Sequence, residues 1–152
     1  MSNEQRIANC IYAYASAMDA GDFAEVGRLL AECAVTFAGT EGVHRGADAL
    51  TGLYSSTTRR YDDGTPKTKH VTTNVAITVE GESASAGSYF TVLQAVPGHL
   101  VLQPIIAGRY ADTFKNDGEF WTFETRHVTV DLMGDLSAHL TFDLEAEAPL
   151  RD

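Results

Sequence analysis

The fold of this chain is decided by residues 68–132, TKHVTTNVAITVEGESASAGSYFTVLQAVPGHLVLQPIIAGRYADTFKNDGEFWTFETRHVTVDL. β-branched and aromatic residues dominate this stretch, and short turn signals divide it into long strand-like runs. The turn signals are Glu-Gly-Glu at 80–82, Pro-Gly at 97–98 and Asn-Asp-Gly at 116–118. Short turns between long runs predict antiparallel hairpins. The four expected strands span residues 70–79, 83–96, 100–114 and 119–132. Pro104 indicates a bulge or an edge position in the third run.

Upstream of this stretch, helical spacing replaces strand-like alternation. Apolar residues recur along one helical face at Ile7, Cys10, Ile11, Tyr14 and Met18. We expect Gly21 to end this helix, and Asp22 with Glu25 to form a capping-box variant that opens a second one. A short strand over residues 34–38 and a short helix over residues 46–54 are expected to follow.

Helices followed by a long antiparallel sheet predict an α+β fold. We expect N-terminal helices to pack on one face of four antiparallel strands, with one additional short strand. A strongly curved sheet of this kind would form a cone around a central pocket. The length predicts a single domain over residues 1–152, with an acidic, frayed end from about residue 145.

The charge balance excludes several classes of partner. The 152 residues include 21 Asp and Glu against 11 Lys and Arg, so no basic stripe is available for nucleic acid or an anionic membrane. No apolar run approaches the roughly 18 residues of a transmembrane helix. Cys10 and Cys33 occupy apolar positions and are interpreted as buried thiols of a cytoplasmic protein. The histidines are scattered without metal-ligand spacing, so we expect no metal and no cofactor.

Four segments carry a resemblance to a known family. They are YASAMDAGDFAEVGRLLAECAV at 14–35, HRGADAL at 44–50, TKHVTTNVAITVEGESASAGSYF at 68–90 and GRYADTFKNDGEFWTFETR at 108–126. In these segments the chain resembles the SnoaL-like branch of the nuclear transport factor 2-like (cystatin-like) superfamily. That branch includes polyketide cyclases, scytalone dehydratase and bile-acid 7α-dehydratase. The resemblance is fairly specific for the fold and weak for the reaction, because this fold hosts many activities.

The resemblance implies three catalytic residues. Asp19 in MDAGDF matches the aspartate that the dehydratases place at the end of the first helix. His70 in TKHVTTN matches their histidine at the start of a strand, and Tyr14 matches the active-site tyrosine of the bile-acid enzyme. Met18 stands where the scytalone enzyme has a tyrosine, and that enzyme's second histidine has no evident counterpart. Both departures argue against scytalone itself as the substrate.

These three residue types suit an elimination beside a carbonyl group. A histidine, with an ordinary pKa of about 6.5, can remove the acidic C–H proton and then protonate the departing hydroxide. A neighbouring carboxylate fixes the imidazole tautomer, and a phenol donates to the enolate oxygen. The sequence therefore predicts a cofactor-free lyase or isomerase acting on a small hydrophobic, cyclic, carbonyl-bearing molecule. Each residue also has a structural interpretation: a helix-capping Asp19, a core Tyr14 and a strand-edge His70.

Five further residues are expected to bind the substrate: Tyr54, Asn74, Arg109, Tyr110 and Trp121. Three of them have plain alternatives. Asn74 would equally well hold backbone groups, Arg109 would form a structural ion pair with Asp112, and Trp121 would serve as packing or pocket wall. Arg126 and His127 are weaker candidates, and at most one of them faces the cavity, because they point to opposite faces of a regular strand.

Strand alternation bears on the assembly. Regular alternation places His70 on the more polar face of its strand and Val75 and Ile77 on the other. Either His70 lies outside the core, or the sheet is buried on both faces and another subunit covers the apolar one. The resemblance favours the second interpretation, so we expect a homo-oligomer, a trimer or alternatively a dimer.

A second function class competes with the enzyme. The β subunit of ring-hydroxylating dioxygenases shares this fold, and a non-catalytic subunit or ligand-binding module of that kind would make Asp19 and His70 incidental. An epoxide hydrolase needs several carboxylates and an arginine around one water, and only Asp19 has a clear position for that. Hydrogen-bond reach between the Asp19 carboxylate and the His70 imidazole would favour the lyase or isomerase.

Overall fold

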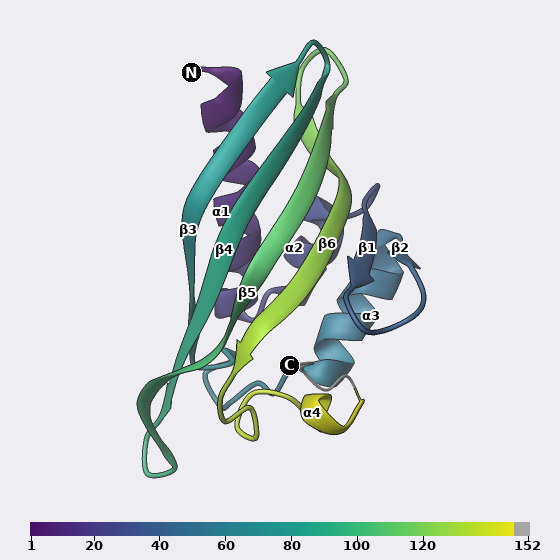
Figure 1. The fold of residues 1–152 in the computed structure, drawn as a ribbon. Helices are drawn as coiled ribbons and strands as arrows, with labels where there is room; N and C mark the ends of the chain where they lie inside the picture. Colours follow the sequence, from purple (N-terminus) through teal and green to yellow (C-terminus); the bar gives the residue numbers. More distant parts are fainter. Residues whose placement is uncertain (148–152) are drawn as a thin grey trace.

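The computed structural model of the chain describes residues 1–147. Its first part comprises helices α1 (Asn3–Ala20), α2 (Phe23–Leu29) and α3 (Ala47–Thr57), with short strands β1 (Ala34–Phe37) and β2 (His44–Arg45) between α2 and α3. The second part comprises the long strands β3 (Thr68–Glu80), β4 (Ser83–Val96), β5 (Leu100–Asn116) and β6 (Trp121–Met133), followed by the short helix α4 (Leu144–Glu147). Figure 1 shows the long strands side by side, with the helices behind them.

The predicted α+β class is confirmed, with one more strand than expected. The six strands lie in the order β2-β1-β6-β5-β4-β3. The three hairpins of the meander are antiparallel, whereas β1 pairs with β6 in parallel. The sheet is therefore mixed, because β1 precedes the meander in the chain and joins it beside its last strand.

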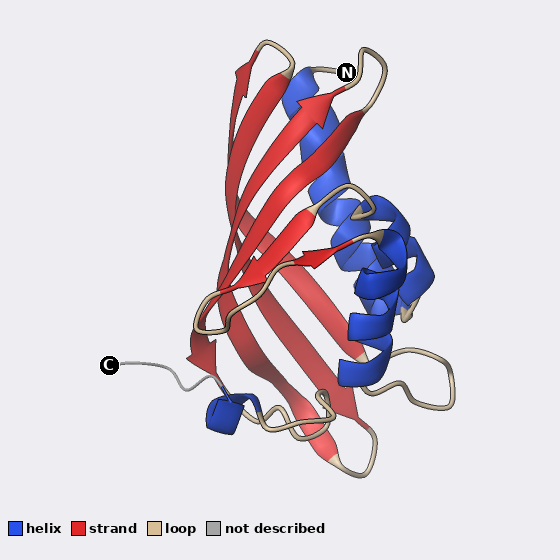
Figure 2. Ribbon diagram, turned by 90° about the vertical axis from the view of Figure 1, so that its right-hand side faces the viewer, coloured by secondary structure: helices blue, strands red, loops and turns tan. Residues whose placement is uncertain are grey.

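The sheet bends strongly around one side, and the helices lie on that concave side (Figure 2). α1 packs chiefly against β3, while α2 packs against α3. Register shifts interrupt all three hairpin pairings, one of them between Val92 and Leu93 opposite the segment that contains Pro104. Such shifts mark bulges, which bend a sheet locally. The bulge that Pro104 predicted is thus confirmed, and the expected curvature is present.

The helix end at Gly21 and the N-cap at Asp22 form as the sequence predicts. The other half of the capping box does not form, because the Glu25 carboxylate accepts from Arg28. Gly21 ends α1 in the left-handed conformation with a φ of 69°, and a Cβ atom there would lie 2.1 Å from the carbonyl oxygen of Gly64. Asp22 caps α2, because its side chain accepts a hydrogen bond from the backbone N–H of Glu25 at 3.0 Å. This junction fixes the end of α1, where Asp19 lies.

A bulge in β3 overturns the expected alternation of that strand. Asn74 has a φ of 54°, and the pairing with β4 shifts between Thr73 and Ala76. Before the bulge Thr72 pairs with Phe90, and after it Ile77 pairs with Ala86. Phe90 and Ala86 are both buried, so Thr72 and Ile77 lie on the same inner face. The prediction that His70 and the later apolar residues of β3 occupy opposite faces is wrong.

This finding removes the argument for a sheet with two apolar faces. Val75, Ile77 and Val79 pack against the core on the side that carries His70. Ile105 is fully buried and Ile106 packs against the same core, although they are neighbours in the chain. The homo-oligomer stays a prediction, and it no longer rests on the apolar residues of these strands.

The structure also bears on the two cysteines, on a membrane-spanning helix and on the C-terminal end. Cys33 is buried and Cys10 is half-buried, and both are free thiols. Within residues 1–147, no helix combines the length and the apolar character that crossing a membrane requires. Of the end expected to fray, residues 145–147 belong to α4, and the rest lies outside the described residues.

Candidate functional site

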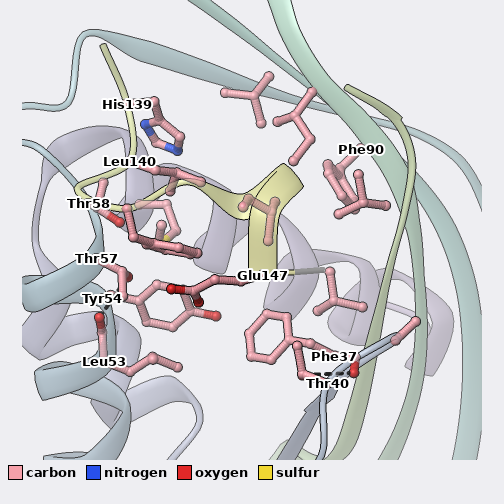
Figure 3. Close-up of a pocket in the computed structure, with 18 of the residues that line it drawn as sticks. Phe37, Thr40, Leu53, Tyr54, Thr57, Thr58, Phe90, His139, Leu140 and Glu147 are labelled. Atoms are coloured by element: carbon pink, nitrogen blue, oxygen red, sulfur yellow. Dashed lines mark hydrogen bonds between the residues drawn. The ribbon is translucent and has the colours of Figure 1, made fainter. Parts of the chain in front are cut away.

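A cavity of about 940 Å³ lies between the concave face of the sheet, helices α1 and α3, and the segment that follows β6. Aromatic rings from four different elements form much of its interior: Tyr14, Tyr54, Phe90 and Tyr110. In Figure 3, Phe90 lies across the cavity from His139 and Leu140. Tyr54 is drawn closer to Phe37 than to Phe90. The wall is mostly apolar with a few polar groups, as is usual for sites that bind small organic molecules.

Asp19 and His70 lie in direct contact beside this cavity. The Oδ1 atom of Asp19 lies 2.5 Å from Nδ1 of His70. The same carboxylate accepts hydrogen bonds from the backbone N–H of His70 at 2.8 Å and from Oγ1 of Thr68 at 2.9 Å. The side chains of Asp19 and His70 are 13% and 6% exposed. Asp19 therefore fixes both the main chain and the ring orientation of His70.

Only the histidine of this pair reaches the cavity. His70 lines it, whereas Asp19 stands behind the imidazole. Burial alone would raise the pKa of the Asp19 carboxyl, but hydrogen bonds and charge attraction from His70 and a hydrogen bond from Thr68 lower it below its ordinary value. Asp19 is thus an anion that holds Nδ1, and Nε2 is the ring nitrogen left for exchange of a proton with a ligand.

Three tyrosines converge on the cavity from α1, α3 and β5. The hydroxyl groups of Tyr14 and Tyr54 lie 3.1 Å apart, and the Tyr110 ring meets the Tyr14 ring edge-on at 5.9 Å. Burial raises the pKa of both Tyr54 and Tyr110 well above the ordinary value. Their phenols are therefore protonated at neutral pH and can act as hydrogen-bond donors.

Gly108 leaves room for the stacked rings of Phe90 and Tyr110, which form the floor of the cavity. The rings of Phe90 and Tyr110 stack at 4.6 Å. A Cβ atom on Gly108 would lie 2.0 Å from the carbonyl oxygen of Thr129 and 2.8 Å from the Phe90 ring. Any larger residue would push the ring or the adjacent strand, so a glycine is required at this position.

A buried ion pair lies beneath the tyrosines. Arg126 and Asp112 form two hydrogen bonds of 2.7 and 2.8 Å, and both side chains are fully buried. The Arg126 guanidinium stands 3.8 Å from the ring centre of Tyr110 and 4.4 Å from that of Tyr14. Burial alone would lower the pKa of Arg126, but the Asp112 charge raises it above its ordinary value. The pair therefore holds a permanent cation against the two rings.

The structure does not bring all the expected substrate-binding residues to the cavity. Tyr54 and Tyr110 line it, but Asn74, Arg109 and Trp121 do not. Asn74 is exposed at the β3 bulge, where its backbone takes the left-handed conformation. Arg109 points to the outer face and binds Asp131 at 2.8 and 2.9 Å, so its expected pairing with Asp112 is also wrong.

The third of these residues lies at the far end of α1. The indole N–H of Trp121 donates to the side-chain oxygen of Asn3 at 3.2 Å, and the ring is buried there. Its alternative interpretation as a packing residue fits this position. Asn74, Arg109 and Trp121 thus lie outside the lining of this cavity, and their contact with a ligand stays a prediction.

Sequence reasoning missed His139, which lines the cavity from the segment after β6. The residue is 6% exposed, and its Nδ1 atom is buried without a hydrogen-bond partner among the described residues. The surrounding sequence, Ser137 to Leu140, has neither helical nor strand periodicity. Only long-range contacts place it here, so no local pattern would have found it. Among residues 1–147, no three metal-ligating side chains gather into a possible ion site.

Comparison with known proteins gives results for the family and for the fold. The model of the SnoaL-like domain family matches residues 1–127. No match was found among curated proteins. Three similar solved structures come from Novosphingobium aromaticivorans. The first, a nuclear transport factor 2-like protein with a cystatin-like fold, is 20% identical with a TM-score of 0.69, covering 88% of this chain and 84% of that one.

The other two differ in the function that they are described with. A proposed scytalone dehydratase is 19% identical with a TM-score of 0.67, covering 86% of this chain and 85% of that one. The β subunit of a proposed aromatic-ring-hydroxylating dioxygenase is 18% identical with a TM-score of 0.65, covering 90% of this chain and 94% of that one. At these identities the structures establish the shared fold alone. The family match over residues 1–127 goes further, and the chain belongs to the SnoaL-like domain family.

Proposed function

We propose that this protein is a cofactor-free lyase or isomerase of the dehydratase type, acting on small hydrophobic cyclic molecules that carry a carbonyl group. The observation that carries the proposal is the 2.5 Å contact between Asp19 and His70 Nδ1 at the wall of a largely apolar cavity. A binding module has no need for an imidazole held by a nearly buried carboxylate. The proposal for the substrate class rests on the aromatic and aliphatic lining of that cavity.

His70 is the proposed acid–base residue. Its Nε2 atom takes the proton from the carbon beside the carbonyl group, and the C–H electron pair moves into an enolate. In a dehydration, the enolate electrons return, the C–O bond of the β-hydroxyl group breaks, and the His70 imidazolium gives its proton to the departing hydroxide as water. In an isomerisation, the same proton returns to a different carbon. Histidine ends each cycle unchanged.

Asp19 and Tyr14 have distinct supporting roles in this proposal. Asp19 is a positioning residue, because it contacts the imidazole and does not line the cavity. It keeps the proton on Nδ1 and stabilises the imidazolium, as a carboxylate does beside histidine in hydrolases. Tyr14 reaches the cavity and shares a hydrogen bond with Tyr54, so this phenol pair supplies a donor for the enolate oxygen.

Turnover of a simple cyclic β-hydroxy ketone tests the proposal. Loss of water from 3-hydroxy-1-tetralone yields 1-naphthol after tautomerisation, and 1-naphthol is followed by its fluorescence. We expect the wild-type protein to accelerate this reaction and His70→Gln to lower kcat by about 10²- to 10⁴-fold, the usual contribution of a general acid–base group. His99→Gln is the matched control, since His99 is exposed in the β4–β5 turn. Equal kcat values for His70→Gln and the wild type would contradict the proposal.

A further inference from the structure

A second imidazole, that of His139, lies at the wall of the cavity. Nδ1 of His139 is buried and makes no hydrogen bond within residues 1–147, although the side chain lines the cavity. A buried polar atom without a partner costs about 1–3 kcal/mol, so such groups are uncommon in folded proteins. Figure 3 shows the His139 ring beside Leu140, on the same side of the cavity as Thr58 and apart from Tyr54.

The main chain on either side of His139 is held firmly. The carbonyl oxygen of Ala138 accepts hydrogen bonds from Nε2 of Gln94 at 3.0 Å and from the Tyr61 hydroxyl at 2.5 Å. The carbonyl oxygen of His139 itself accepts from the backbone N–H of Arg59 at 2.7 Å. The imidazole is therefore presented to the cavity by a fixed backbone, as a binding residue must be to select its ligand.

The protonation of this imidazole follows from its surroundings. Burial, and then the positive charge that His70 can carry, lower the pKa of His139 to about 4, against a weaker opposing effect of Asp19. His139 is thus neutral at pH 7 and carries a single N–H. A proton on the buried Nδ1 atom would be a donor without an acceptor among the described residues. The proton therefore belongs on Nε2, with the unpartnered lone pair on Nδ1.

We propose that His139 is a ligand-binding residue whose neutral Nε2–H donates a hydrogen bond to a ligand oxygen beside His70. The inference rests on the proposed function for the identity of that oxygen, the hydroxyl group on which His70 acts. Its chemical consequence is a cavity with two separate polar positions. The Tyr14–Tyr54 phenols bind one oxygen of the ligand, and His139 binds a second. The site therefore selects cyclic molecules with two oxygen substituents over otherwise equal molecules with one.

Equilibrium binding of two unreactive aromatic probes tests this selection. 1-Naphthol carries one hydroxyl group and 1,3-dihydroxynaphthalene carries two on the same ring system. We expect the wild-type protein to bind the diol roughly three- to tenfold more tightly, as one additional neutral hydrogen bond would provide. His139→Phe removes the donor at similar size and should abolish this ratio, whereas His139→Gln keeps an N–H donor and should retain most of it.

Two controls keep the result unambiguous. His99→Phe changes an exposed histidine and should leave the ratio of the two dissociation constants unchanged. If His139→Phe fails to fold, ¹⁵N NMR of histidine-labelled wild-type protein shows which ring nitrogen carries the proton. We expect Nε2 of His139 to be protonated at pH 7 and its signal to shift on addition of the diol. A proton on Nδ1, or no response of His139 to the diol, overturns the proposal.

The outcomes separate this proposal from the proposed catalysis. An unchanged ratio in His139→Phe, or no binding of either probe to the wild type, overturns the role of His139. Loss of the difference between the two dissociation constants in His139→Phe supports the binding role. This holds even if His70→Gln has no effect on turnover, because binding at equilibrium needs no proton transfer. In that last case the proposed catalysis fails and the binding role of His139 stands.

Discussion

Replacement of Asp19 by asparagine separates positioning from binding at this site. The carboxylate accepts hydrogen bonds from three donor groups, and the bond from His70 Nδ1 is the shortest at 2.5 Å. Asparagine retains one oxygen for the backbone N–H of His70 or for Thr68, but its NH₂ group cannot accept from Nδ1–H. The imidazole would then lose its charge-assisted bond and the tautomer that leaves Nε2 free to take a proton.

The size of the effect follows from that one bond. A hydrogen bond to a charged group contributes about 1.5–3 kcal/mol, and each 1.4 kcal/mol corresponds to about a tenfold change in rate. We therefore expect Asp19→Asn to lower kcat by about 10- to 100-fold, less than His70→Gln. Because Asp19 does not line the cavity, KM should stay within about twofold.

The assay is steady-state turnover of 3-hydroxy-1-tetralone across pH 5 to 9, with circular dichroism to confirm folding. Asp22→Asn is the matched control, because Asp22 is an exposed carboxylate three residues away and asparagine caps helices equally well. The variant should also change the shape of the pH–rate profile, which a purely structural residue would not do. A rise in KM with an unchanged kcat would contradict the positioning role of Asp19, since it would make this residue a ligand contact.

Three further expectations concern stability. Asp112→Ala leaves the Arg126 cation buried and unpaired, so urea unfolding should show a loss of about 3–5 kcal/mol, largely recovered in the double variant Asp112→Leu, Arg126→Met. The pKa of Asp19 in the folded protein lies below its ordinary value, because the interactions with His70 outweigh the effect of burial. The ionised carboxylate therefore stabilises the fold fully above about pH 4, and this stabilisation disappears as the pH falls through the lowered pKa. The difference in unfolding free energy between wild type and Asp19→Asn should accordingly shrink between pH 6 and pH 3. Gly108→Ala should destabilise by about 1–3 kcal/mol and weaken 1-naphthol binding, because the new methyl group displaces the Phe90 ring at the cavity floor; unchanged affinity and stability would contradict this packing.

Local signals predicted the elements well, because their causes are local. Gly21 and Asp22 mark a helix end and a helix start through their own backbone and side-chain geometry. The turn residues between the long strands fix the hairpins in the same way. The dyad of Asp19 and His70 followed from the family resemblance and its motif positions, and the structure brings the two side chains together.

The errors have a common physical origin in contacts between distant segments. The alternation of β3 changes face at Asn74, and a bulge depends on the pairing of two strands rather than on one. Regular alternation placed His70 and Ile77 on opposite faces of the strand, and this mismatch came from the bulge rather than from a second apolar face of the sheet. His139 reaches the cavity only because residues of β4 and of the segment before β3 hold its backbone.

Hydrogen–deuterium exchange at the carbon beside a ketone tests whether His70 acts as the base. In D₂O, ¹H NMR follows the loss of the C2 proton signals of 1-tetralone, a molecule without a leaving group, so that only proton removal and return are measured. We expect faster exchange with wild-type protein than with buffer alone. His70→Gln that is folded and still binds 1-tetralone should exchange at a rate near that of buffer. Equal acceleration by both proteins, or none by wild-type protein with the ketone bound, would contradict His70 as the base.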